Sequence, residues 1–191
     1  MKYKIGVYGS AVNENKSTNQ LAKELGQVLG DHDVIIVTGA CSGIPYLTAF
    51  EAAKRGKEVW GFSAELNLEN QKKAYPDDDS SIYSKLFYIP PEFPFSDQQE
   101  VCRRYRNVTS TATVDAGIIV AGRWGTLNEY TNLYDMEKVV GILTGSGGVA
   151  DEILNLNQKI YKPSKASIIY NNSPEKLVEE VVKNLAIKIN K

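Results

Sequence analysis

Arg106 and Glu129 are the residues of this 191-residue chain whose types and spacing best suit chemistry. They flank a short apolar run at residues 117–120, so we expect them on the helices before and after one buried strand. A guanidinium binds phosphate or another polar group through its planar fork of N–H donors. A carboxylate acts as a general base, or stabilises positive charge that grows on a sugar carbon. The pair therefore fits a site for a phosphorylated ligand.

Both residues also have structural interpretations. Thr126 and Glu129 have the spacing of a capping box, in which the glutamate only satisfies the start of a helix. Arg106 belongs to an arginine-rich segment that would form a solvated helix face, with Glu100 and Arg104 as an ordinary ion pair one turn apart. The spacing alone leaves these alternatives open.

Glycine-containing turns follow four of the predicted strands, and three of them lead directly into predicted helices. Glycine permits positive φ and close backbone approach, and a helix N-terminus offers free N–H groups and a partial positive charge, which together make a phosphate site. None of the turns is a Walker loop or a dinucleotide-binding fingerprint. The residues that we expect to bind the ligand or its phosphate are Gly9, Ser10, Gly39, Gly43, Gly122, Arg123, Gly125 and Thr126.

The elements that must position these residues are short apolar runs rich in Ile and Val, which alternate with longer amphipathic stretches. Such runs are typical of strands buried on both faces of a parallel sheet, where ligands bind at the carboxyl ends of the strands. We therefore predict an α/β fold, a Rossmann-like, open and mostly parallel sheet of about seven strands with helices on both faces. The predicted strands are 4–8, 34–37, 59–62, 86–89, 117–120, 139–143 and 167–170.

Start and stop signals place helices between these strands. Ser17 and Asp97 each precede a glutamine or glutamate by three residues, which predicts a capping box at each position. Ser173 precedes a proline, which predicts the first turn of the last helix, and Gly56 marks the end of an earlier one. Residues 63–97 form one irregular stretch, in which we interpret the acidic triplet at 77–79 as a solvated turn and the proline segment at 89–95 as a loop of fixed shape. A lid or pocket wall is the functional alternative for the whole stretch.

Composition excludes several classes of protein. With 22 Lys and Arg against 23 Asp and Glu, the formal net charge is −1, so nucleic acid is not an expected partner. Two cysteines exclude a disulfide scaffold and favour a reducing, cytoplasmic location. One histidine, His32, makes a metal site unexpected, and no cofactor is predicted. Because no apolar run approaches the ~18 residues of a membrane span, no membrane association is expected.

Arg106 and the segment 115–129, DAGIIVAGRWGTLNE, resemble the signature of the LOG ("Lonely Guy") proteins, a family long described as lysine decarboxylases. The stretches IGVYGSA and TGACSGIPYLTAFEAAKRG are also similar to that family, and the resemblance covers about residues 2–145. It implies a nucleoside 5′-monophosphate phosphoribohydrolase, an AMP-like ligand, catalytic roles for Arg106 and Glu129, and a homodimer. We expect residues 1–191 to form a single nucleotide-binding, LOG-like domain.

The phosphate loop departs from that signature. The family's proline and second glycine are Ala121 and Arg123 here, while Asn107 and Ser110 replace a lysine and a methionine. These changes resemble a divergent branch that includes a molybdenum-cofactor carrier. The resemblance therefore also implies an alternative, a protein that binds or carries a nucleotide or pterin-type ligand without cleaving it. A DNA-processing relative of the same fold is a third alternative, which the near-neutral charge disfavours.

Other residues suggest packing or an interface. Cys41 lies at a predicted helix start, but His32 falls at the opposite edge of the sheet, so a Cys–His pair is not expected. Trp124 either stacks on a base or fills an apolar contact. A helix surface that fits a subunit interface contains Tyr130, Leu133, Tyr134 and Met136.

Overall fold

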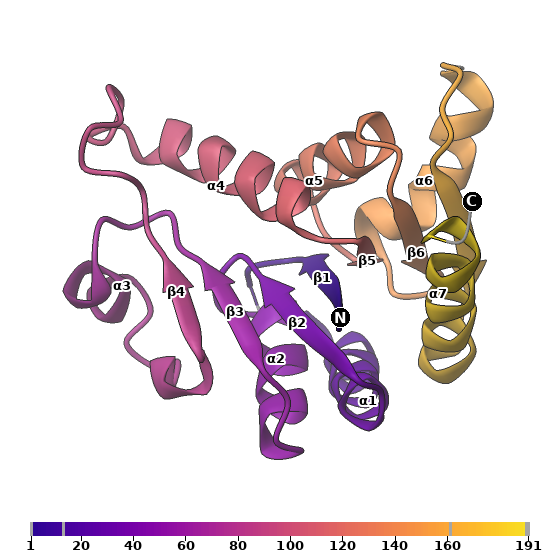
Figure 1. Ribbon diagram of the computed structural model, residues 1–191, viewed down its shortest axis with the longest axis horizontal. Helices are drawn as coiled ribbons and strands as arrows, with labels where there is room; N and C mark the ends of the chain where they lie inside the picture. The colour runs from indigo at the N-terminus through magenta and orange to yellow at the C-terminus, as the bar shows by residue number, and fades with distance from the viewer. Residues whose placement is uncertain (1, 13, 161, 190–191) are drawn as a thin grey trace.

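The computed structural model describes residues 2–12, 14–160 and 162–189. Seven strands in these ranges form one all-parallel sheet in the order β4-β3-β2-β1-β5-β6-β7 (Figure 1). The predicted fold class is confirmed. The strands are β1 (Tyr3–Gly9), β2 (Val34–Thr38), β3 (Val59–Phe62), β4 (Lys85–Phe87), β5 (Ala116–Val120), β6 (Val139–Leu143) and β7 (Ser167–Asn171).

The order of the strands reverses at the centre of the sheet. β1 pairs with β2 on one side and with β5 on the other, so the chain first builds outward to β4 and then returns to β1 before it builds out to β7. The connections that leave β1 and β5 therefore diverge, which opens a crevice at the carboxyl ends of these strands. This crevice is where the fold favours a ligand site.

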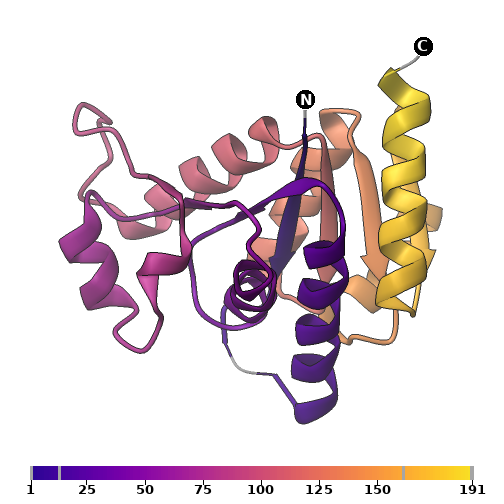
Figure 2. The same cartoon turned by 60° about the horizontal axis from the view of Figure 1, so that its bottom comes forward.

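Helices cover both faces of the sheet (Figure 2). One face carries α1 (Lys16–Asp31), α2 (Ile44–Lys54) and α7 (Pro174–Ile189), and the other carries α4 (Gln99–Thr113), α5 (Trp124–Asp135) and α6 (Gly148–Lys159). The last helix begins at its predicted proline. Within the described ranges, no helix is both long and apolar enough to cross a membrane.

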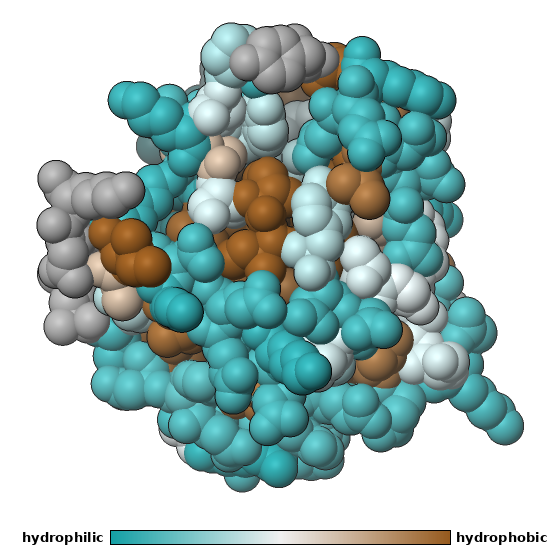
Figure 3. Space-filling view, turned by 90° about the vertical axis from the view of Figure 1, so that its right-hand side faces the viewer, coloured by the Kyte–Doolittle hydropathy of each residue, from teal (hydrophilic) through white to brown (hydrophobic). Residues whose placement is uncertain are grey.

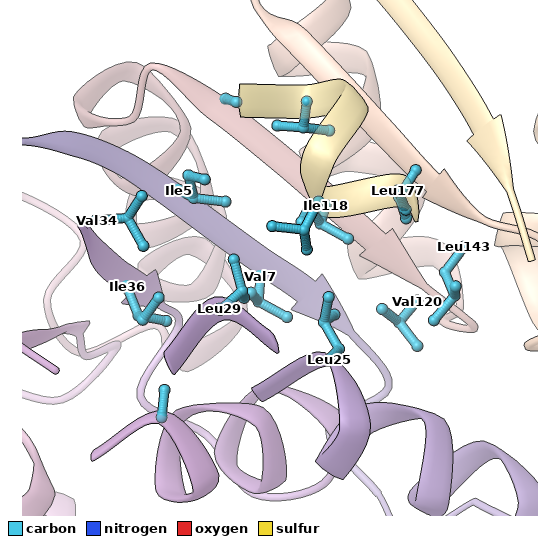
Figure 4. Close-up of a cluster of buried hydrophobic side chains, with 14 of the residues drawn as sticks. Ile5, Val7, Leu25, Leu29, Val34, Ile36, Ile118, Val120, Leu143 and Leu177 are labelled. Carbon is cyan, nitrogen blue, oxygen red and sulfur yellow. The ribbon is translucent and has the colours of Figure 1, made fainter. Parts of the chain in front are cut away.

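The alternation of side chains along each strand divides the core in two. Ile5 and Val7 of β1 pack with Leu25 and Leu29 of α1 on one face (Figure 4), whereas Tyr8 packs on the other. The central strands are buried on both faces, which explains their uniformly apolar sequence. Burial of each such leucine or isoleucine stabilises the fold by about 1.5–3 kcal/mol.

The surface at the β7 end of the sheet is mostly hydrophilic. Figure 3 looks onto this side and shows an apolar strip between polar side chains. The exposed large apolar residues of α6 and α7 are Leu154, Ile160 at the end of α6, and Ile187. Exposed apolar residues of this kind are usual on the surface of a folded protein.

Two predicted capping boxes are wrong because the helices begin elsewhere. Asn15 caps α1 by accepting a hydrogen bond from the Thr18 N–H at 2.9 Å, which places Ser17 inside the helix. The residue before α4 is Gln98, whose side chain makes no capping bond, so Asp97 lies outside the helix. At α1 a better acceptor stands nearby, whereas at α4 the helix begins one residue later without a capping side chain.

The segment 63–97 has more regular structure than its sequence predicts. It contains β4, the short helix α3 (Leu68–Ala74) and a 3₁₀ helix, η1 (Ser80–Ile82). β4 begins and ends earlier than the predicted strand at 86–89. Asn67 caps α3 by accepting from the Asn70 N–H, but a helix of seven residues shows too little periodicity to be predicted.

Gln71 of α3 ties this segment to the body of the protein. Its side chain is buried, donates to the Ala40 carbonyl at 2.8 Å and accepts from the Ser63 hydroxyl at 2.5 Å. A buried side-chain amide whose N–H and carbonyl groups are both hydrogen-bonded holds the helix in one position. The hydrogen bond to Ala40 fixes α3 next to the turn that follows β2.

Gly26 sets the distance between α1 and α2. A Cβ at this position would lie 2.3 Å from the Thr48 carbonyl oxygen and 2.9 Å from Cβ of Glu51. We predict that Gly26→Ala lowers the free energy of unfolding by about 2 kcal/mol, because overpacking outweighs the better helix propensity of alanine. Chemical denaturation measures this difference.

Gly30→Ala on the same helix is the matched control. Its methyl group would meet chiefly the side chain of Arg55, at 2.3 Å from Cδ, and that side chain can move. We expect a loss of less than about 1 kcal/mol, since the gain in helix propensity offsets the contact. If both variants lost the same free energy of unfolding, the close approach of α1 to α2 at Gly26 would not be the cause.

Candidate functional site

A cavity of about 390 Å³ lies at the carboxyl ends of the central strands, where the strand order reverses. The turns after β1 and β2 form part of its wall, and α4 and α5 supply the charged side chains. The structure thus brings together residues that are far apart in the sequence. The predicted site residues that line it are Gly9, Ser10, Gly39, Arg106, Arg123, Gly125, Thr126 and Glu129.

Gly43 and Gly122 do not line this cavity, and both have structural reasons to be glycine. Gly43 has a φ of +76°, and a Cβ there would lie 2.3 Å from the Ser10 carbonyl oxygen. Gly122 has a φ of +94°, and a Cβ there would lie 2.4 Å from Oγ1 of Thr126. Both positions need positive φ and close approach, so they shape the turns behind the cavity.

The N-terminus of α5 is open toward the cavity. The helix begins at Trp124, and Arg123 precedes it without a capping side-chain bond. The N–H groups of Trp124, Gly125 and Thr126 have no intrahelical acceptor, because the first helical bond runs from Leu127 to the Arg123 carbonyl. Since Gly125 and Thr126 line the cavity, this end offers donors and partial positive charge to an anion.

This helix start also corrects the capping-box interpretation of Glu129. Thr126 is the third residue of α5 rather than its cap, so Glu129 lies one turn too far along to close the helix start. Its side chain belongs to the cavity wall instead. The spacing that predicts a capping box thus arises from two residues that line one site.

The other glycine-rich turns do not offer free donors of this kind. At the start of α2, the Ile44 N–H donates to the Ser10 carbonyl at 2.9 Å and Pro45 has no N–H. At the turn after β6, the N–H groups of Gly145 and Gly147 donate to the Asp151 carboxylate. The protein itself thus supplies acceptors for part of these two helix starts.

Glu129 is a buried carboxyl group on the wall of the cavity, with 6% of its surface exposed. Burial raises its pKa to about 7, and the guanidinium groups of Arg106 and Arg104 offset only part of this effect. At neutral pH the group therefore exists in both protonation states, as suits a general base.

Arg106 of α4 reaches across the cavity to the turn after β2. Its Nη1 donates to the Gly39 carbonyl, and a Cβ on residue 39 would overlap the guanidinium. Gly39 is therefore required for the approach of the arginine. Within the described chain Arg106 and Glu129 do not form an ion pair, although the charge of the arginine lowers the pKa of the carboxyl group.

Four buried polar atoms of cavity-lining residues have no hydrogen-bond partner, namely Oη of Tyr8, Oγ of Ser10, Nε of Arg106 and Oδ1 of Asn107. A buried polar group without a partner costs about 1–3 kcal/mol, so native proteins contain few of them. Their convergence on one cavity indicates a polar ligand. Asn107 is absent from the predicted site residues, because its type alone gives no functional signal.

The cavity is rich in arginine. Four of the five arginines in the sequence line it: Arg103, Arg104, Arg106 and Arg123. Arg103 pairs with Glu100 at 2.6 Å, which corrects the predicted pair of Glu100 with Arg104. A helical projection would not have assigned the first three to one site, because Arg104 and Arg106 are two residues apart and project to different sides of a helix.

Tyr75, at the end of α3, is a further wall residue that the sequence does not reveal. Cys41 also lines the cavity, and burial raises the pKa of its thiol, as expected for a buried residue rather than a nucleophile. Among the residues that the structure describes, no group of three or more His, Cys, Asp or Glu side chains is placed to hold a metal ion.

Two predictions about aromatic residues need correction. Trp124 neither lines the cavity nor fills an apolar contact, since 79% of its surface is exposed. Tyr130 and Leu133 belong to the core between α5 and the sheet, so they are not free to form the predicted subunit interface. A homodimer remains a prediction, and Tyr134 and Met136 are the partly exposed residues of the predicted interface.

The chain belongs to the SLOG cluster4 family, whose model matches residues 2–178. This result confirms the LOG-like superfamily inferred from Arg106 and the segment 115–129. No curated protein matches the sequence.

Solved structures share the fold at low sequence identity. The crystal structure of TM1055 has a TM-score of 0.74 and 18% identity, over 96% of this chain and 99% of that one. The molybdenum cofactor binding protein from the phototrophic bacterium Rippkaea orientalis has a TM-score of 0.69 and 17% identity, over 97% and 98%. DNA processing protein A from Helicobacter pylori, described for its single-stranded DNA binding mode, has a TM-score of 0.67 and 15% identity, over 95% and 81%.

At these identities the likeness shows the fold alone. The neighbours nevertheless bear on the range of partners that the fold accommodates, because one binds a molybdenum cofactor and another binds single-stranded DNA. The expectation that nucleic acid is no partner, which rests on the net charge, is therefore not supported.

Burial of Glu129 makes the stability of the protein depend on pH. Its pKa rises from 4.5 to about 7 on folding, so the folded chain binds more protons than the unfolded chain between these values. The free energy of unfolding therefore falls as pH rises from about 4.5 to about 7. We predict that Glu129→Gln is more stable than the natural protein at pH 8, by about 1–3 kcal/mol, and similar to it at pH 4.5.

Thermal unfolding at the two pH values measures this difference. Glu179→Gln, an exposed change on α7, is the control and should leave the pH dependence as it is. A stability gap between Glu129→Gln and the natural protein that is the same at both pH values would contradict a raised pKa.

Proposed function

We propose that the protein is a nucleoside 5′-monophosphate phosphoribohydrolase, which hydrolyses the N-glycosidic bond to a free base and ribose 5-phosphate. The observation that carries this proposal is the position of Glu129. Its buried carboxyl group lies one helical turn after the open N-terminus of α5, on the wall of the same cavity. A phosphate held at that helix start would place the attached sugar next to the carboxylate.

The phosphate would accept hydrogen bonds from the first N–H groups of α5 and from the Thr126 hydroxyl. The ribose and base would then extend toward the turns after β1 and β2. Gly9 at the end of β1 is needed for close packing behind this wall, since a Cβ there would lie 2.5 Å from the Val120 carbonyl oxygen. Ser10 and Arg106 present their unpartnered polar atoms to the ligand.

The reaction breaks the bond between C1′ of the ribose and the nitrogen of the base. The bonding electrons leave with the base, and positive charge develops on the sugar ring, where the Glu129 carboxylate would stabilise it. Water adds its oxygen to C1′ and Glu129 accepts the proton that the water loses. The departing base takes up one proton from solvent at its nitrogen, and Glu129 then returns its proton to solvent. The low polarity that raises the pKa of Glu129 also strengthens its interaction with the sugar cation.

A second candidate is a protein that binds a nucleotide or pterin-type ligand without cleaving it. The backbone of the phosphate loop favours this candidate. Ala121 has a φ of +49°, which proline does not adopt, so the loop differs from the LOG signature in conformation as well as in sequence. One neighbour of the same fold is a molybdenum cofactor binding protein.

We predict that the protein releases free base from at least one nucleoside 5′-monophosphate, and that Glu129→Gln lowers kcat at least about 100-fold. Chromatography of a panel of monophosphates measures the base. Glu100→Gln, which changes a carboxylate on the cavity rim that is paired with Arg103, is the matched control and should lower kcat less than about threefold.

The two candidates give different results. Thermal stabilisation by a nucleotide or pterin ligand, without base release and unchanged in Glu129→Gln, would establish the binding protein and overturn the hydrolase. Base release that persists in Glu129→Gln would overturn the assigned role of the carboxylate.

The pH profile provides a further test. Because the carboxylate rather than the carboxylic acid stabilises the cation and accepts the proton, kcat/KM should rise with pH and level off above about 7. Initial rates between pH 5 and pH 9 measure this limb. A profile that is flat through pH 7, or that falls there, would exclude Glu129 as the group that must ionise.

A further inference from the structure

Arg104 and Arg123 stand at the exposed rim of the cavity without a protein partner. Within the described chain, neither side chain forms an ion pair or a hydrogen bond with another residue. Arg103 differs, since it lines the same cavity but pairs with Glu100 at 2.6 Å. The rim therefore carries two unpaired guanidinium groups.

Both groups lie on the α5 side of the cavity. Arg123 is the residue immediately before α5, so it adjoins the N–H groups proposed to hold a phosphate. Arg104 lies on α4, which packs against α5, and its charge is close enough to lower the pKa of Glu129. Arg103 instead acts on Tyr75 at the end of α3, where its charge offsets part of the rise in the pKa of the tyrosine hydroxyl.

One phosphate group does not use all of these donors. On the cavity wall the start of α5 offers the free N–H groups of Gly125 and Thr126 and the Thr126 hydroxyl, which suffice for the oxygens of one phosphate. The planar forks of Arg104 and Arg123 would remain unused, although such forks match a phosphate in a bidentate manner. Two unpaired like charges on one rim are most favourable when an additional anion binds between them.

We propose that this site binds nucleoside 5′-diphosphates in preference to monophosphates, with the inner phosphate at the start of α5 and the outer phosphate on Arg104 and Arg123. The inference rests on the proposed function for its ligand class, a 5′-nucleotide. It leaves the glycosidic step unchanged: water adds to C1′ and gives its proton to Glu129, the departing base takes a proton from solvent, and the diphosphate stays attached to the ribose.

Calorimetric titration with matched pairs, AMP and ADP, GMP and GDP, CMP and CDP, and UMP and UDP, tests the proposal. For the base that binds, we expect the diphosphate to bind at least tenfold more tightly than the monophosphate. Arg104→Gln and Arg123→Gln should each remove most of this preference, while they weaken monophosphate binding less than about threefold. Arg103→Gln is the matched control and should preserve the preference.

Equal or tighter binding of the monophosphate by the natural protein would overturn the proposal. So would rim variants that weaken both members of a pair to the same extent, or the absence of binding by every nucleotide. Base release from monophosphates without a diphosphate preference would leave the hydrolase in place and reject only this inference. A diphosphate preference without base release would support this inference and reject the hydrolase.

Discussion

The burial of one carboxyl group, Glu129, is the constraint on which the rest of the site depends. An isolated carboxylate inside a protein is costly, and the group responds by raising its pKa to about 7. Arg106 and Arg104 offset part of this cost without closing an ion pair with the carboxylate. The side chain therefore stays available to a ligand, and the protein gives up stability at neutral pH to keep it so.

The fold places this carboxyl group by bringing the connections that follow β1, β2 and β5 to one edge of the sheet. Because β5 returns beside β1, the turn after β1 faces the start of α5, and α4 carries Arg106 to the turn after β2. Positive φ at Gly43 and Gly122 allows these turns to pack closely behind the cavity. The open helix N-terminus, the unpartnered polar atoms and the arginine-rich rim together describe a receptor for an anionic, polar ligand.

The sequence predicts the sheet well because buried strands are uniformly apolar over their whole length. It predicts much of the cavity wall for a related reason, since residues that follow parallel strands must meet at one edge. It fails where partners come from distant segments. Asn15 outcompetes Ser17 as a helix cap, Gln71 anchors a helix too short to show periodicity, and the pairing of Glu100 with Arg103 depends on side-chain geometry that spacing does not determine.

The most direct test of this account is the pKa of Glu129 in the folded protein, measured by carbon-13 NMR of the labelled side-chain carboxyl group. Glu129→Gln identifies the resonance by its loss. A titration midpoint near 7 is the predicted result, and it should move upward when an anionic nucleotide binds beside the group. A midpoint near 4.5, unchanged by nucleotide, would contradict a carboxyl group buried on the wall of a phosphate-binding cavity.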